Sequence, residues 1–103
     1  MSKIKNIILF YRMLSKKKTL EVVVRGDSML PALKNGNVVK IEFNNNYSKG
    51  DIILYITNEQ PVIHRICDVI CTDNHIFYRT KGDNSEVFDP LVPEFMVIGK
   101  VSI

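Results

Sequence analysis

Apolar and polar residues alternate in short runs along most of the chain. From residue 37 to 43, Val39, Ile41 and Phe43 are separated by charged residues, which is the period of a half-buried β-strand. Similar runs predict further strands at residues 20–26, 52–56, 62–71, 75–80 and 95–103, and Asn44-Asn45-Asn46 predicts a hairpin turn. Short strands separated by turn residues indicate a mostly β domain, coiled like a barrel.

The first 18 residues follow a different period. Their apolar positions recur at helical spacing: Ile4, Ile7, Ile8, Tyr11 and Leu14. Lysines and an arginine surround them, so residues 1–18 are predicted to form a short basic amphipathic helix that precedes a β-domain at residues 19–103. Two interpretations stay open: the helix packs its apolar stripe on the β-domain, or it contacts an anionic membrane surface or a partner.

The apolar run at residues 7–10 is far below the ~20 residues that a membrane-spanning helix needs. It is also too short for a secretory signal, and no small-residue cleavage site follows it. We therefore expect a cytoplasmic protein without a transmembrane anchor, whose contact with a membrane, if it has one, is peripheral and made by residues 1–18.

Charge is distributed unevenly along the 103 residues. Residues 1–25 contain seven Lys or Arg and one Glu, whereas the remainder contains seven basic and ten acidic residues. A basic arm is compatible with nucleic-acid binding, but the chain has no aromatic platform or helix-turn-helix pattern, and the rest of the domain is acidic. Nucleic acid is therefore not an expected partner.

One serine has the surroundings of a nucleophile. Ser28 lies in Arg-Gly-Asp-Ser-Met-Leu-Pro, residues 25–31, directly after the β-branched run at residues 22–24 and close to Gly26, which lets another backbone approach. A helix-favouring segment follows at residues 31–34. Alternatively, Asp27 or Ser28 caps the following turn, which such residues commonly do.

A serine hydroxyl needs a base, and the chain offers a candidate. His64 lies inside an apolar strand, and an imidazole with an ordinary pKa of about 6.5 can take the serine proton and return it to a leaving amine. An acid that binds the other ring nitrogen would fix the histidine. Asp83 and Asp89, in the turn-rich loop at residues 81–90, are both candidates for that role.

Taken in order, the stretches at residues 25–31, 50–55, 61–66, 81–90 and 97–101 resemble the conserved boxes of the signal peptidase and repressor-autopeptidase superfamily. The resemblance implies a serine endopeptidase that cleaves a leader or signal-type peptide on a coiled β-domain, with no cofactor or metal. Bacterial signal peptidases and repressors have a lysine base, whereas the archaeal and endoplasmic-reticulum type has a histidine. His64 followed by Arg65 is similar to the histidine type.

The resemblance also suggests individual roles. It implies Ser28 as nucleophile, His64 as base, and Asp89, seven residues after Gly82, as the acid that orients the histidine. Asp83 is then expected to organise the loop by bonding nearby backbone amides. The Ser28 N–H is an expected donor to the oxyanion. Some signal peptidases add a serine hydroxyl two residues before the nucleophile, but this chain has Gly26 there, so a second donor must come from the backbone or from elsewhere.

Relatives bind an extended peptide against the strand before the nucleophile. This implies substrate contacts along the strand at Glu21 and Val23, with Gly26, Met29 and Pro31 at the wall of the site. Repressor-type self-cleavage is not expected, because the chain has no Ala-Gly or Cys-Gly bond. The alternative function is a catalytically inactive member of the same fold that binds peptides as a partner protein.

Two cysteines and two histidines superficially suggest zinc. Cys67 and Cys71 lie between His64 and His75, but the spacing fits no common zinc module. Buried, reduced cysteines are the expected alternative.

Overall fold

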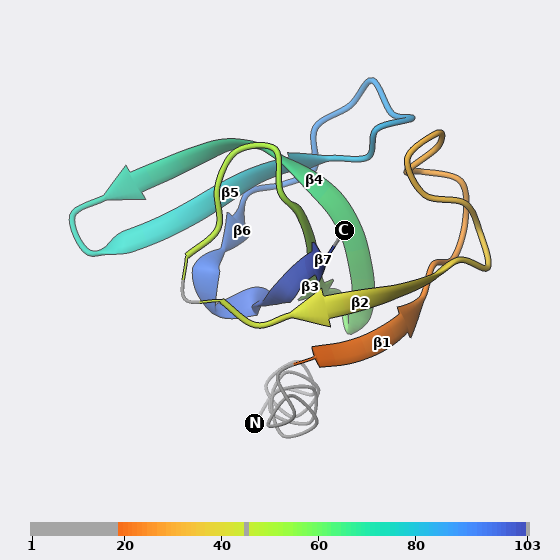
Figure 1. Cartoon of the computed structure of the whole chain (residues 1–103). Helices are drawn as coiled ribbons and strands as arrows, with labels where there is room; N and C mark the ends of the chain where they lie inside the picture. The colour runs from red at the N-terminus through yellow and green to blue at the C-terminus, as the bar shows by residue number, and fades with distance from the viewer. Residues whose placement is uncertain (1–18, 45, 103) are drawn as a thin grey trace.

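The structure, a computed structural model, describes residues 19–44 and 46–102 and contains one seven-stranded antiparallel sheet (Figure 1). The elements are β1 (Thr19–Val23), β2 (Val38–Glu42), β3 (Ile52–Thr57), β4 (Gln60–Thr72), β5 (His75–Lys81), β6 (Val92–Pro93), the 3-10 turn η2 (Glu94–Met96) and β7 (Val97–Ser102). The strand order is β1-β2-β7-β3-β4-β5-β6. The prediction of a mostly β fold is confirmed.

The sheet coils without closing into a barrel. Within the described ranges, β1 pairs only with β2 and β6 only with β5, so the two outer strands of the sheet do not meet. The predicted helix at residues 1–18 lies outside the described residues. The division of the chain at residue 18 therefore stays a prediction.

Strand β3 lies at the centre of two hydrophobic clusters. Ile52, Leu54 and Ile56 pack into one cluster with Ile41 of β2 and residues of β7, whereas Ile53 and Tyr55 pack into the other with Tyr78 of β5. Because alternate side chains of a strand point to opposite faces, a continuous apolar run is buried on both sides. Because the sheet is coiled, other parts of it cover β3 on both of its faces.

Strand β4 changes partner along its length. Its first part pairs with β3 as far as Arg65, and its second part pairs with β5 from Arg65 onward. The register shifts between Ile66 and Asp68, where an extra residue forms a bulge. The edge of β4 that would face β5 is therefore unpaired, within the described residues, from Gln60 to His64.

Two loops bring residues far apart in the sequence to the start of β4. The loop after β1, orange in Figure 1, approaches the light-blue loop after β5 at the right of the view. Asn84 of the second loop donates its backbone N–H to the Ser28 carbonyl of the first, at 2.8 Å. The helix-favouring segment at residues 31–34 forms turns rather than a helix, with Leu33 N–H donating to the Met29 carbonyl.

Candidate active site

Ser28 is presented at the tip of a tight turn. Gly26 has a φ of +83°, a left-handed conformation that favours glycine, and its N–H donates to the Asn35 side chain at 2.9 Å. The Leu30 N–H donates to the backbone carbonyl of Asp27, and Ser28 is exposed. The Ser28 hydroxyl bonds a histidine instead of a following amide, so its side chain does not cap this turn.

The structure brings three of the four predicted catalytic side chains into one hydrogen-bonded series. Ser28 Oγ lies 3.1 Å from His64 Nε2, and His64 Nδ1 lies 2.6 Å from Asp89 Oδ2. The side chains of His64 and Asp89 are 15% and 24% exposed. The series therefore runs from an exposed hydroxyl to a carboxylate that is largely shielded from water.

Two residues that sequence reasoning missed hold Asp89. Thr80 Oγ1 donates to Asp89 Oδ2 at 2.7 Å, and the Tyr55 hydroxyl donates to the same oxygen at 3.1 Å. Burial raises the pKa of Tyr55 above its ordinary value, so its hydroxyl keeps its proton and can donate it. Each of the two is a polar side chain in a core strand, which indicates that the group needs a partner when buried but not which partner it has.

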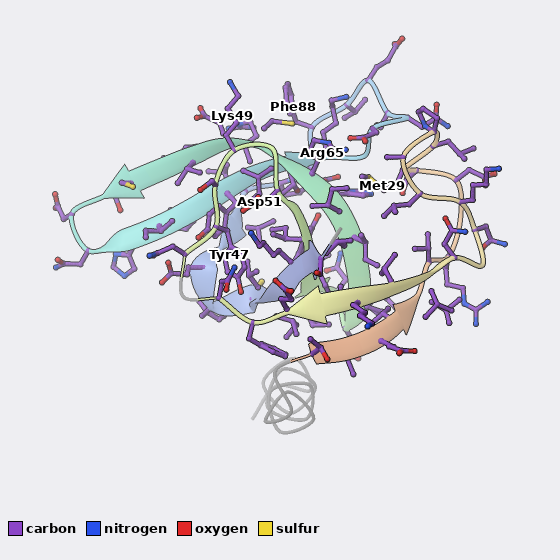
Figure 2. All side chains as sticks on the ribbon, in the orientation of Figure 1. Met29, Tyr47, Lys49, Asp51, Arg65 and Phe88 are labelled. Atoms are coloured by element: carbon purple, nitrogen blue, oxygen red, sulfur yellow. The ribbon has the colours of Figure 1, made fainter. Side chains whose placement is uncertain are left out.

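Asp83 bonds Arg65 and not His64. Its carboxylate accepts two hydrogen bonds from the guanidinium, at 2.8 and 2.7 Å, and Arg65 also donates to the Gly50 carbonyl at 2.9 Å. Hydrogen bonding to Arg65 lowers the pKa of Asp83 below its ordinary value. We expected Asp83 to bond backbone amides; its side chain instead ties the loop after β5 to β4. Figure 2 labels Arg65 on β4 and Met29 on the loop after β1.

The loop after β5 also holds the serine turn. Asn84 donates its backbone N–H to the Ser28 carbonyl at 2.8 Å and its side-chain amide to the Asp27 carbonyl at 3.2 Å. Met29 Sδ accepts the Asp83 N–H at 3.4 Å, and Met29 is buried. The position of Ser28 is thus fixed by contacts with the segment that immediately precedes Asp89.

A groove of about 250 Å³ leads to Ser28 and His64. It is lined by Val22, Val23, Val24, Arg25, Ser28, Met29, Pro61, Val62, Ile63 and His64. Of the predicted substrate contacts, Val23 and Met29 line this groove, whereas Glu21, Gly26 and Pro31 are not among the lining residues. The groove therefore lies between β1, with the residues just after it, and the unpaired edge of β4.

Backbone groups of both strands face this groove. Val24 exchanges hydrogen bonds with residues 36 and 37 on the β2 side, so by alternation the N–H and C=O of Val23 and Arg25 point the other way. Asn58 and Glu59, both with positive φ, form a two-residue hairpin between β3 and β4. The hairpin puts Pro61 and Ile63 at positions whose backbone groups point away from β3, and proline suits such an edge.

The described residues, 19–44 and 46–102, also bear on metal binding, on the burial of the cysteines and on membrane-spanning helices. No group of three or more His, Cys, Asp or Glu that could hold a metal occurs there. Cys67 is half-buried and Cys71 exposed, so the expectation that both are buried was wrong; the bulge and the outer end of β4 leave them near the surface. No helix in these ranges is long and apolar enough to cross a membrane.

The sequence of the chain is similar to those of known peptidases. A family model described as Peptidase S24-like matches residues 3–102. Signal peptidase I W of Bacillus subtilis (strain 168) is 32% identical over 75 residues, which cover 69% of this chain and 39% of that protein. The signal peptidase complex catalytic subunit SEC11 of Yarrowia lipolytica (strain CLIB 122 / E 150) is 32% identical over 87 residues, 79% of this chain and 51% of that protein. The chain thus spans about half the length, or less, of these relatives.

Proposed function

The chain belongs to the Peptidase S24-like family, and from this premise we propose that it is a serine endopeptidase with Ser28 as nucleophile, His64 as general base and Asp89 as the orienting acid. The observation that carries the proposal is the pair of contacts at His64: Nε2 to Ser28 Oγ at 3.1 Å and Nδ1 to Asp89 Oδ2 at 2.6 Å. Both distances are within the range of a hydroxyl activated by an oriented imidazole.

In the first step, Ser28 Oγ attacks the carbonyl carbon of the scissile peptide bond while His64 Nε2 takes the hydroxyl proton. Asp89 stabilises the imidazolium that forms. The Ser28 N–H has no acceptor within the described part of the chain and is free to donate to the developing oxyanion. His64 then gives the proton to the leaving amine, and a water molecule, activated by the same histidine, releases the acyl group and restores the serine.

The proposed substrate is an extended peptide that adds a strand between β1 and β4. Outward-facing backbone groups of Val23, Arg25 and Ile63 are available for main-chain hydrogen bonds from both sides. The lining is largely aliphatic and the groove is small, which favours small apolar side chains close to the scissile bond. Both relatives are named as signal peptidases, so leader or signal-type peptides are the proposed class.

The test is cleavage of a library of internally quenched peptides with small residues at the central positions, read by fluorescence and by mass spectrometry of the products. Ser28→Ala and His64→Ala are each expected to lower kcat/KM by about 10³-fold or more, with Asp89→Asn close behind. Ser48→Ala, an exposed serine in the turn before β3, is the matched control and keeps full activity.

Two results would contradict the proposal. One is cleavage that persists in Ser28→Ala, which would move the nucleophile elsewhere. The other is a wild-type protein that binds library peptides but leaves all of them intact, which would favour the alternative of an inactive peptide-binding member of the family.

A further inference from the structure

We propose that Tyr55 and Thr80 are positioning residues of this site: their hydroxyls hold Asp89 so that His64 carries its proton on Nδ1 and offers a free Nε2 to Ser28. The catalytic meaning of this arrangement rests on the function proposed above. The arrangement itself is a property of the folded protein and can be tested without a substrate.

Three hydrogen bonds converge on one oxygen. Asp89 Oδ2 lies 2.7 Å from Thr80 Oγ1, 3.1 Å from the Tyr55 hydroxyl and 2.6 Å from His64 Nδ1. An ionised carboxylate oxygen only accepts hydrogen bonds, and the two hydroxyls are donors to it. The third contact must then also be a donor, which assigns the imidazole proton to Nδ1 and leaves the Nε2 lone pair directed at Ser28.

The burial of Thr80 supports a role beyond packing. Thr80 is 0% exposed, and among the described residues it is the one buried polar or charged side chain that is not a tyrosine. A valine would have the same shape and no hydroxyl to desolvate, so a core threonine is favourable only where its hydroxyl is bonded. Its carbonyl also accepts the Asp89 N–H at 2.9 Å, so this residue holds Asp89 by backbone and side chain together.

Tyr55 approaches the carboxylate from a different strand. Its hydroxyl lies 3.1 Å from Thr80 Oγ1 as well as from Asp89, so β3, β5 and the loop after β5 meet at this point. Asp89 Oδ1 has no partner within the described residues, which leaves the two hydroxyls as the restraint on rotation of the carboxylate. The other ion pair of the described residues, Arg65 with Asp83, is satisfied internally, and neither of its side chains bonds His64.

The test is the tautomer of His64 by nitrogen NMR on protein labelled in histidine. The chain has two histidines, and His75, exposed at the start of β5, serves as the internal reference. At pH about 9, well above the ordinary imidazole pKa of ~6.5, wild-type His64 is expected to be Nδ1–H. Thr80→Val is expected to lower the ratio of the Nδ1–H to the Nε2–H form by roughly tenfold, because a charge-assisted hydrogen bond is lost.

Matched variants separate positioning from packing. Thr80→Ser keeps the hydroxyl and should restore the wild-type tautomer, whereas Tyr55→Phe should reduce the ratio less than Thr80→Val because its bond to Asp89 is longer. Tyr78→Phe removes another buried tyrosine hydroxyl, one that does not bond Asp89, and should leave the tautomer unchanged. In cleavage assays, Thr80→Val should lower kcat about 10-fold or more at unchanged KM.

The inference is overturned if wild-type His64 is in the Nε2–H form, or if Thr80→Val and Tyr55→Phe both keep the wild-type ratio. If Thr80→Val does not fold, as the His75 signals would reveal, Tyr55→Phe with its Tyr78→Phe control decides the question. These outcomes are independent of the peptidase test: Ser28→Ala can abolish cleavage while the tautomer is unaffected by Thr80, and the tautomer can depend on Thr80 in a protein that cleaves nothing.

Discussion

At the scale of single residues, the candidate site depends on the absence of a side chain at Gly82. A Cβ built there would lie 2.6 Å from the Ser28 carbonyl oxygen, 3.1 Å from Ser28 Cβ and 3.2 Å from His64 Nε2. The φ of Gly82 is not in the left-handed region, so the need for glycine comes from space alone. The loop after β5 can approach the serine turn this closely only through a glycine.

Gly82→Ala is therefore expected to separate Ser28 from His64. A displacement of the order of 1 Å at a reacting pair lowers the rate by about 10²-fold. The overpacking should also cost about 1–3 kcal/mol of unfolding free energy. Gly36→Ala is the control: its φ of +90° makes alanine strained by about 1 kcal/mol, but open space surrounds its Cβ and the site is not touched. Equal loss of kcat/KM in the two variants would contradict this prediction.

At the scale of elements, the Arg65–Asp83 pair joins β4 to the loop that carries Gly82 and Asn84. The pair uses two parallel hydrogen bonds, and its side chains are 35% and 20% exposed, so water screens it in part. The pair does not touch the Ser28–His64–Asp89 series. Its expected contribution is to the stability of the loop, at about 1 kcal/mol.

This contribution should depend on pH in a definite direction. The pKa of Asp83 is lowered in the folded protein from its ordinary value of 3.8 by bonding to Arg65. A lowered pKa gives stability that is fully present above pH ~4 and is lost as the pH falls through the folded-state pKa. Asp83→Asn should thus be less stable than wild type at pH ~7 by about 1 kcal/mol, and the difference should vanish in acid.

Urea titrations at several pH values measure this difference. Asp73→Asn, in the turn between β4 and β5, is the control and should match wild type throughout. A stability gap between wild type and Asp83→Asn that persists or widens at low pH would rule out the ion pair as its source.

Strand positions were more predictable than strand pairing. The alternating and continuous apolar runs predicted every strand of the sheet except the two-residue β6, because burial imposes a period that is visible locally. The hairpin expected at Asn44-Asn45-Asn46 was wrong: β2 and β3 are not neighbours, since β7 lies between them. The bulge in β4, between Ile66 and Asp68, had no signature in the sequence either.

In the candidate site, too, the residues within local motifs were predictable and those that depend on strand pairing were not. Ser28, His64 and Asp89 could be nominated because their neighbours form motifs, and the different roles of Asp89 and Asp83 were implied by the resemblance to the superfamily. Tyr55 and Thr80 could not be nominated, because a lone polar residue in an apolar strand gives no indication of the group that it meets across the sheet. That information depends on strand order and register, which non-local pairing decides.

At the scale of the whole molecule, two hydrophobic clusters share the central strands β3 and β7. Leu54 and Ile98 belong to one cluster, whereas Tyr55 and Val97 belong to the other. Gly99 of β7 lies where the Ile41 side chain and the Glu42 backbone of β2 approach most closely; a Cβ there would lie 2.7 Å from Ile41 Cγ2. The close packing of β2 on β7 therefore links β1 and its groove to the rest of the sheet.

Gly99→Ala is consequently expected to destabilise the molecule as one unit, by about 2–3 kcal/mol. The chain has no tryptophan, and three of its four tyrosines, Tyr47, Tyr55 and Tyr78, lie in the same cluster, so tyrosine fluorescence reports mainly on that side, whereas far-UV circular dichroism reports on the entire sheet. Because the clusters share two strands, both signals should change together in urea, at a lower midpoint than in wild type.

Lys100→Ala, next along β7 and half-buried, is the control and should shift the midpoint far less. Separate midpoints for the two signals would mean that the clusters unfold independently, and β1 with Ser28 could then detach while His64 and Asp89 stay in place.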